Sequence, residues 1–146
     1  MSSAIDANLL LYASDRSSPF HERALETVTM LAAGPALLYL FWPVAMAYLR
    51  IATHPGVFAR PLPWRAASEN IRGLLERDNV RSPGEDEGFW PLFADTADAA
   101  GVRGSLVPDA HLVALMRRSG VTTLWTHDRD FRRFDGITLQ DPFAGA

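Results

Sequence analysis

Short apolar runs alternate with longer segments of helical periodicity along this chain. Residues 4–12 begin as a buried strand that leads through a turn into a helix, and residues 36–40, 121–126 and 137–139 have the pattern of further short strands. Apolar residues at helical spacing cover five segments: 20–31, 43–52, 64–77, 87–100 and 108–119. The pattern therefore predicts strands and helices in alternation.

This alternation determines the expected fold. Strands separated by helices favour a parallel sheet with helices on both faces. No internal repeat, low-complexity run or linker interrupts the pattern. We therefore expect an α/β fold, a three-layer α/β/α sandwich around a mostly parallel sheet, with residues 1–146 in one domain.

The composition narrows the functional classes. Apolar residues make up 48% of the 146 residues, which is enough for one core, and the formal net charge is −3. All 14 basic residues are arginines. Contact with RNA therefore needs a confined arginine surface, or a metal ion that offsets the acids. The lack of cysteine excludes disulfides, thiolate catalysis and cysteine-ligated zinc.

Neither a signal peptide nor a membrane span is expected. The first six residues contain no basic residue before a hydrophobic stretch. The longest apolar run, 36–49, is shorter than the roughly 20 residues of a membrane-spanning helix, and Pro43 interrupts it. We therefore expect a soluble cytoplasmic protein with no membrane association.

Four aspartates lie at or near predicted strand ends. Asp6 follows the first strand, and Asp128 and Asp130 follow the strand over 121–126. Asp109 lies in the first turn of the helix over 108–119, just after a short apolar pair. Ligands in open α/β sheets bind beyond the carboxyl ends of the strands. We therefore expect one edge of the sheet to gather these carboxylates.

Clustered carboxylates indicate a bound cation or a shared proton, because like charges a few ångströms apart repel each other. Hard oxygen ligands select Mg²⁺ or Mn²⁺, which can polarise a phosphate and help to deprotonate water. The pattern thus favours hydrolysis of a phosphodiester. Each acid also has a structural explanation: Asp6 as a turn former or helix cap, Asp109 as a charge favoured at a helix N-terminus, and Asp128 and Asp130 as caps of a short helix.

Three motifs and one longer stretch resemble the PIN domain family, in the family's order. Residues 6–8 resemble its Asp-x-Asn opening, residues 108–112 its Asp-Ala-His-Leu helix start, and residues 126–134 its closing Thr-x-Asp-x-Asp-Phe motif with a later Phe. Residues 42–58 resemble a VapC-type toxin subfamily abundant in mycobacteria. The resemblance covers nearly the whole chain and implies a PIN-like sandwich.

The resemblance assigns roles to the four acids. Asp6, Asp109 and Asp128 would hold Mg²⁺, with Mn²⁺ as a possible substitute, and Asp130 would be a supporting or alternative catalytic acid. The activity implied is Mg²⁺-dependent cleavage of RNA, commonly tRNA or another structured RNA, by the toxin of a type II toxin–antitoxin system that inhibits translation.

Four further residues are candidates around these acids. By the resemblance, Asn8 and Thr126 would orient the carboxylates. Arg50 could bind phosphate bidentately and His54 could transfer protons, or Arg50 pairs with an aspartate and His54 caps its helix. The acidic residues 85–87 are expected to be an exposed helix start and not ligands.

The resemblance also implies partners. A VapB-type antitoxin, the RNA substrate and a second copy of the chain in a homodimer are expected. We expect the antitoxin to bind a hydrophobic groove between the first helices, near Trp42, Tyr48 and Phe58, although these aromatic residues could equally belong to the core.

One departure from the family leaves an alternative. Many PIN domains carry a glutamate on the second helix, whereas residues 44–50 contain none and Ala47 takes its place. The chain could therefore be a catalytically weak PIN-like module that binds RNA or protein. Metal-dependent cleavage that is lost on Asp6→Ala or Asp109→Ala while binding persists would separate the two readings. An aspartyl phosphatase is disfavoured, because Asn8 stands where such enzymes need a second aspartate.

Overall fold

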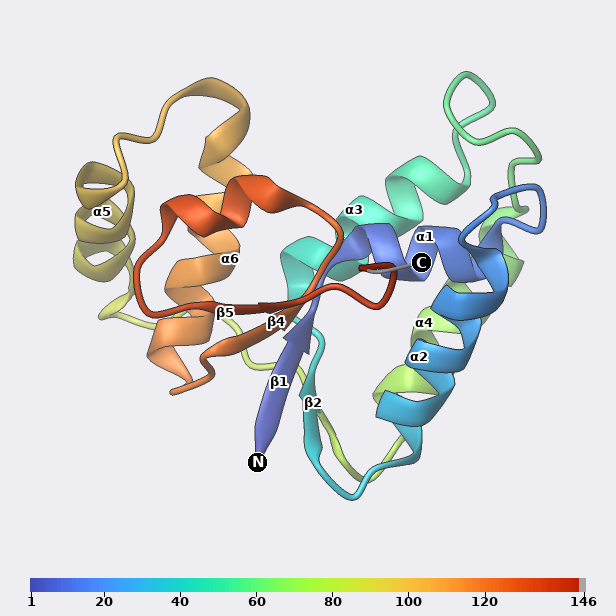
Figure 1. Cartoon of the computed structure of the whole chain (residues 1–146), viewed down its shortest axis with the longest axis horizontal. Helices are drawn as coiled ribbons and strands as arrows, with labels where there is room; N and C mark the ends of the chain where they lie inside the picture. The colour runs from blue at the N-terminus through green and yellow to red at the C-terminus, as the bar shows by residue number, and fades with distance from the viewer. Residues whose placement is uncertain (145–146) are drawn as a thin grey trace.

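The computed structural model describes residues 1–144, which form a central five-stranded sheet with helices around it (Figure 1). The sheet is parallel throughout, with the strand order β3-β2-β1-β4-β5. In chain order the strands are β1 (Ser2–Ile5), β2 (Leu37–Tyr39), β3 (Val80–Arg81), β4 (Thr123–Trp125) and β5 (Thr138–Gln140). In the register at the centre, Ala4 of β1 lies opposite Tyr39 of β2 and Leu124 of β4.

Six α-helices connect these strands and cover the sheet. They are α1 (Ala7–Ser14), α2 (His21–Ala33), α3 (Trp42–Ala52), α4 (Trp64–Leu75), α5 (Phe89–Ala99) and α6 (Val107–Arg118). Residues 1–144 also contain two short 3₁₀ helices. η1 (Gly104–Leu106) lies directly before α6, and η2 (Arg129–Arg133) follows β4. Helices α5 and α6 lie on one side of the strands, and α2 and α4 lie on the other (Figure 1). The predicted α/β/α sandwich is confirmed, with a sheet that is wholly parallel.

Local chemistry explains where the helices begin and end. The side chain of Asp6 accepts the backbone N–H of Ala7, so α1 begins directly after β1 without the turn that we expected. Helix α2 ends at Gly34, whose φ of 75° lies in the left-handed region that glycine adopts readily. Prolines at the first positions of α3 and α6 lack an N–H that a helix start does not use.

The core lies between the sheet and these helices. Its largest fully buried side chains include Phe41, Tyr48, Leu9, Met116 and Leu124. Burial of apolar side chains at this scale supplies the main driving force for folding, at roughly 25 cal/mol per Å² of apolar surface removed from water. The core therefore fixes the strands whose carboxyl ends carry the acids.

One strand was missing from the sequence prediction. Strand β3 is two residues long, too short for any alternation to be read, and Val80 is its buried member. It pairs with β2 through the N–H of Leu38 to Asn79 O (2.8 Å) and the N–H of Leu40 to Arg81 O (2.9 Å). Pairing with a neighbouring strand, and not the local pattern, makes this segment a strand.

Within residues 1–144, no helix has both the length and the apolar character that a bilayer crossing requires.

Candidate metal centre

The site forms beyond the carboxyl ends of the central strands. Strand β1 lies between β2 and β4, so the connections to its two neighbours leave in opposite directions, and ligands of open α/β sheets bind at this position. The N–H of Asp6 donates to Trp125 O (3.0 Å), which continues the β1–β4 pairing by one residue. The residues that follow the two strands are therefore held beside each other.

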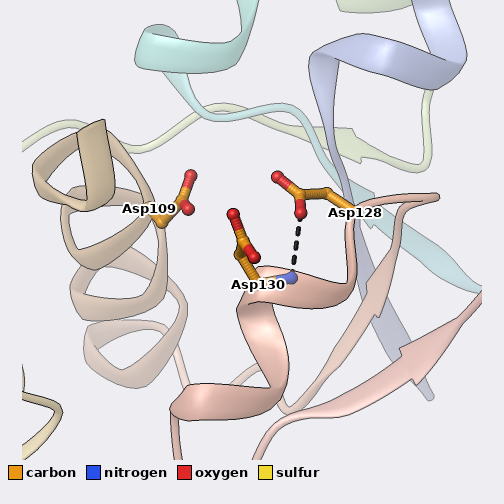
Figure 2. Close-up of side chains that lie close together, drawn as sticks. All are labelled: Asp109, Asp128 and Asp130. Carbon is orange, nitrogen blue, oxygen red and sulfur yellow. Dashed lines mark hydrogen bonds between the residues drawn. The ribbon is translucent and has the colours of Figure 1, made fainter.

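Three carboxylates meet beyond this edge. Asp109 comes from the first turn of α6, and Asp128 and Asp130 come from the start of η2; their side chains point toward one another (Figure 2). One oxygen from each lies within 4.8 Å of the others. The N–H of Asp130 donates to Asp128 Oδ1 (2.9 Å), which fixes the turn that presents both side chains. Carboxylates at this spacing could hold a metal ion after small movements of the side chains.

Asp6 lies behind this group and uses both oxygens in hydrogen bonds. Its Oδ1 accepts the N–H of Ala7 (2.7 Å) and its Oδ2 accepts the hydroxyl of Thr126 (2.8 Å). The sequence prediction named Asp6, Asp109 and Asp128 as metal ligands, with Asp130 as a supporting or alternative acid. Within residues 1–144 the oxygens that lie within 4.8 Å of one another belong to Asp109, Asp128 and Asp130, and the charge of Asp6 acts on Asp109, so the exact ligand set stays a prediction.

Burial and the crowding of these acids raise the pKa of two of them, Asp109 and Asp6. Burial, followed by the charges of Asp128, Asp6 and Asp130, raises the pKa of Asp109 to about 7. Burial also raises the pKa of Asp6, against the opposing effect of its hydrogen bonds from Thr126 and Ala7. A site of this kind is stabilised by a divalent cation, because the cation offsets the repulsion among the carboxylates.

The donor set fits Mg²⁺ or Mn²⁺. All ligand atoms are carboxylate oxygens, and Asp130 is exposed while Asp109 and Asp128 are half-buried, so an ion could keep several waters. Asn8 Oδ1 is buried and has no hydrogen-bond partner within residues 1–144. A water held by a cation beside Asp6 is one donor that could satisfy this oxygen.

Thr126 connects the two strand ends. Its hydroxyl donates to Asp6 Oδ2, and its oxygen accepts the N–H of Asp128 (3.0 Å) and the Nδ2 group of Asn8 (3.3 Å). The threonine is 1% exposed, so water competes little for these bonds. The hydroxyl of Thr126 thus contacts Asp6, Asn8 and the backbone of Asp128, and the orienting role that the resemblance implies stays a prediction.

Arg50 and His54 lie at the far end of α3. Arg50 is exposed and forms no ion pair within residues 1–144, so the expected pairing with an aspartate is absent there. His54 is exposed and its Nδ1 accepts the N–H of Gly56 (2.9 Å), as a residue that shapes a turn after a helix does. Helix α3 contributes no carboxylate, and Ala47 is half-buried.

Sequence reasoning missed how residues 85–88 support the site. Glu85 accepts a hydrogen bond from His111 (2.6 Å), and Asp86 accepts two from Arg118 (2.7 and 2.9 Å). These bonds tie an otherwise exposed loop to the start and the end of α6, the helix that carries Asp109. The partners are 26 and 32 residues apart, so no local pattern could reveal them. The hydrogen bond from His111 lowers the pKa of Glu85.

A cavity of about 740 Å³ lies between α1, α2 and α4. Tyr48 (1% exposed) and Phe58 (7% exposed) contribute to its lining and also belong to the buried side chains, which is the alternative left open by the sequence. Trp42, at 39% exposure, is not part of the lining. Two of the three aromatic residues expected near a groove between the first helices therefore lie at this cavity.

Comparison with known proteins gives a consistent picture. Residues 4–137 match the family model of the PIN domain. Ribonuclease VapC48 of Mycobacterium tuberculosis is 52% identical over 145 residues, which cover 99% of this chain and 100% of that protein. The structure of Mycobacterium tuberculosis VapC20, a sarcin–ricin loop cleaving toxin, superposes with a TM-score of 0.64 at 17% identity, over 93% of this chain and 98% of that one. A toxin–antitoxin complex from Klebsiella pneumoniae gives a TM-score of 0.61 at 15% identity, over 97% and 98% of the two chains.

Proposed function

The chain belongs to the PIN domain family and to its VapC type, and from this premise we propose that it is a metal-dependent endoribonuclease and the toxin of a type II toxin–antitoxin pair. The observation that carries the proposal is the cluster of Asp109, Asp128 and Asp130, with one oxygen from each within 4.8 Å of the others. Such a cluster suits a hard divalent cation and, through it, an RNA phosphate.

We propose the following roles for the four acids. Asp109, Asp128 and Asp130 hold Mg²⁺ or Mn²⁺, and Asp6 adds negative charge from behind and can serve as a further ligand. When bound, the ion supplies Lewis-acid stabilisation of charge on the phosphate. Because the pKa of Asp109 is raised to about 7 without an ion, ion binding must displace a proton from this residue and therefore strengthens as pH rises.

The surrounding polar residues have positioning roles in this proposal. Asn8 and Thr126 orient Asp6 and Asp128 through the hydrogen bonds of the buried threonine. Arg50 and His54 are kept as candidates for contact with substrate alone, because both are exposed, Arg50 forms no ion pair within residues 1–144, and His54 uses only its Nδ1 in the hydrogen bond from Gly56.

The proposed substrate is structured RNA such as tRNA, and its cleavage would inhibit translation. Similar proteins support this proposal: VapC48 carries the name ribonuclease, and VapC20 is described as cleaving the sarcin–ricin loop. The net charge of −3 argues against general coating of RNA. We therefore expect recognition to depend on the bound cation and on local arginines.

A VapB-type antitoxin is the proposed partner, docked in the cavity between α1, α2 and α4. The cavity has an apolar floor that includes Leu10, Val28 and Ile71 and a charged rim. An amphipathic helix or strand that presents apolar anchors fits such a groove. We further propose a cytoplasmic homodimer of one-domain chains, with the exposed Trp42 and Met46 on α3 as candidate dimer contacts.

Cleavage of total RNA with and without Mg²⁺ or Mn²⁺, followed by sequencing of the new ends, tests the proposal. We expect defined cuts that EDTA abolishes. Asp109→Asn and Asp128→Asn should each lower the rate by more than about 100-fold, beyond the 10–100-fold range of changes around a metal site. Asp98→Asn, an exposed acid on α5 outside the cluster, is the matched control. Binding of RNA without any cleavage would favour the weakly catalytic module instead.

A further inference from the structure

A small aromatic cavity lies between α5 and α6, apart from the acid cluster. It has a volume of about 250 Å³ and an almost wholly apolar lining. Its walls are formed by six residues, Phe89, Trp90, Phe93, Val107, Pro108 and His111. Trp90 is 69% exposed and Val107 is 43% exposed, so the cavity is open to solvent. Packing of the core does not explain why these aromatic side chains line a cavity that is open to solvent.

The rings are held in a fixed arrangement. Phe89 and Phe93 stack with centroids 5.8 Å apart and an interplanar angle of 22°, and Trp90 lies 5.8 Å from Phe93. His111 meets Phe89 edge-on at 5.3 Å, and its Nε2 is bound to Glu85 (2.6 Å). The walls are therefore preorganised, with the indole of Trp90 as the most exposed surface.

The cavity and the carboxylates share one helix end. Pro108 and His111 line the cavity, and Asp109 between them in the chain points to the acid cluster. Helix α6 lies between α5 and the strands (Figure 1), and its first turn contributes residues to both sites. An α-helix with side chains is roughly 10 Å across. A strand of RNA bound at the acids would therefore reach the rings within a few nucleotides.

We propose that this cavity stacks one unpaired nucleobase of the RNA near the phosphate that is cut; the inference rests on the proposed function. Unpaired bases are recognised by stacking on aromatic side chains. The cavity is smaller than the roughly 300–1,000 Å³ sites that take larger ligands, which suits one planar ring system. The cavity therefore selects RNA that is single-stranded at this position.

The shape of the cavity favours a nucleobase over a peptide. A peptide helix or strand needs a long groove with several anchor pockets. The cavity between α1, α2 and α4 offers that shape, and the small cavity beside Trp90 does not.

Binding of a short single-stranded oligoadenylate, measured in EDTA by anisotropy and by tryptophan fluorescence, tests this inference. We expect Trp90→Ala to weaken binding by about 5- to 100-fold, the range for loss of one base–aromatic stack, and Trp90→Phe to retain most of the affinity. Trp64→Ala removes an indole of similar exposure (63%) from α4 and should leave binding within about twofold. Binding should quench fluorescence in the wild type, and Trp90→Phe should lose most of that quenching.

Equal affinity of Trp90→Ala and the wild type for oligoadenylate overturns the inference. A changed elution volume of Trp90→Ala in size-exclusion chromatography, together with unchanged affinity for oligoadenylate, also overturns the inference. The cavity would then serve a contact between protein chains. Failure of the wild type to cut RNA with Mg²⁺ would count against the proposed function, while the binding comparison in EDTA would still decide the stacking. If cleavage is observed, Trp90→Ala should raise KM with little change in kcat, whereas changes at the acids lower kcat.

Discussion

Asp109 is the residue whose charge opposes folding most clearly. Burial and three neighbouring carboxylates raise its pKa to about 7, whereas its ordinary value is 3.8. Between these two pH values the folded protein holds a proton that the unfolded chain has released. Stability therefore falls as pH rises from about 4 to about 7 in the absence of a cation.

We expect Asp109→Asn to remove this pH dependence and to stabilise the metal-free protein at pH 8. One pKa unit corresponds to about 1.4 kcal/mol, and because the side chain is half exposed, solvent screening reduces the gain to on the order of 1–2 kcal/mol. Urea unfolding in EDTA at pH 4 and pH 8 measures the difference, which should nearly vanish at the lower pH. Asp98→Asn should be neutral at both pH values, and a destabilised Asp109→Asn at pH 8 would contradict the argument.

Thr126 is the second residue whose environment makes a definite prediction. Thr126→Val keeps the shape but removes the donor to Asp6 and the acceptor of Asn8 and the Asp128 N–H. We expect a loss of about 1–3 kcal/mol in the free energy of unfolding, since buried polar groups lose their partners. Cleavage should also fall by about 10–100-fold, the range for groups that orient metal ligands.

The control for this change lies three residues earlier in the chain. Thr123 on β4 is half-buried and has no side-chain hydrogen bond within residues 1–144, so Thr123→Val should change the free energy of unfolding by less than about 0.5 kcal/mol. A Thr126→Val protein as stable and active as the wild type would mean that the bridge between β1 and β4 has no positioning role.

At the scale of single residues, the sequence identifies which acids belong to the site but not which of them lie closest together. Asp6, Asp109, Asp128 and Asp130 were all placed near one edge because strand ends converge there. Which three meet most closely depends on hydrogen bonds formed after folding. Asp6 is held back by Ala7 and Thr126, whereas the turn into η2 brings Asp130 forward.

At the scale of elements, the long amphipathic helices and four of the five strands found within residues 1–144 were predictable, whereas the two-residue strand β3 was not. Helices over 43–52 and 64–77 were expected and are found as α3 and α4, with the second ending two residues earlier, at Leu75. Helix α5 begins at Phe89, two residues after the expected start, and the N–H of Gly88 donates to Asp86 Oδ1 (3.1 Å) in the turn before it. Strand β3 depends on β2 alone.

Tyr48 joins three helices and provides a test of their packing. Its hydroxyl forms hydrogen bonds with Ser14 of α1 (2.7 Å) and Asn70 of α4 (2.9 Å) from its own position on α3. We expect Tyr48→Phe to lower the free energy of unfolding by about 1 kcal/mol, because both partners lose a hydrogen bond to the buried hydroxyl. Urea unfolding measures it.

Tyr39→Phe is the matched change. Tyr39 stacks on Phe41 at 5.5 Å, and its hydroxyl has no hydrogen bond within the described residues. Its removal should therefore change stability by less than about 0.5 kcal/mol. If the two variants are equally stable, the hydroxyl of Tyr48 contributes nothing to holding α1, α3 and α4 together.

For the whole molecule, we expect the acid cluster to make stability depend on divalent cations. A ligand that binds only the folded state at 100 times its Kd adds about 2.7 kcal/mol, and each kcal/mol raises Tm by about 2–4 °C in a domain of this size. We expect Mg²⁺ or Mn²⁺ to raise Tm saturably in the wild type. The double change Asp128→Asn with Asp130→Asn should abolish most of this effect, while NaCl at equal ionic strength should not reproduce it.

The global architecture followed from alternation alone, because parallel strands joined by helices permit few arrangements. The strand order with β1 at the centre could not be read from the pattern, since it is set by which faces pack together. Nor could the cavity beside Trp90, whose lining comes from two helices that meet only in the folded chain.

The order of the acids along the chain has a consequence for synthesis. Asp109, Asp128 and Asp130 all come after β1, β2 and β3 in the chain, and the strand that positions two of them, β4, pairs with β1, which is made before it. A nascent chain that stops before residue 120 contains β1, β2 and β3 but lacks two of the three clustered carboxylates. The acid cluster therefore cannot be complete until translation has passed Asp130.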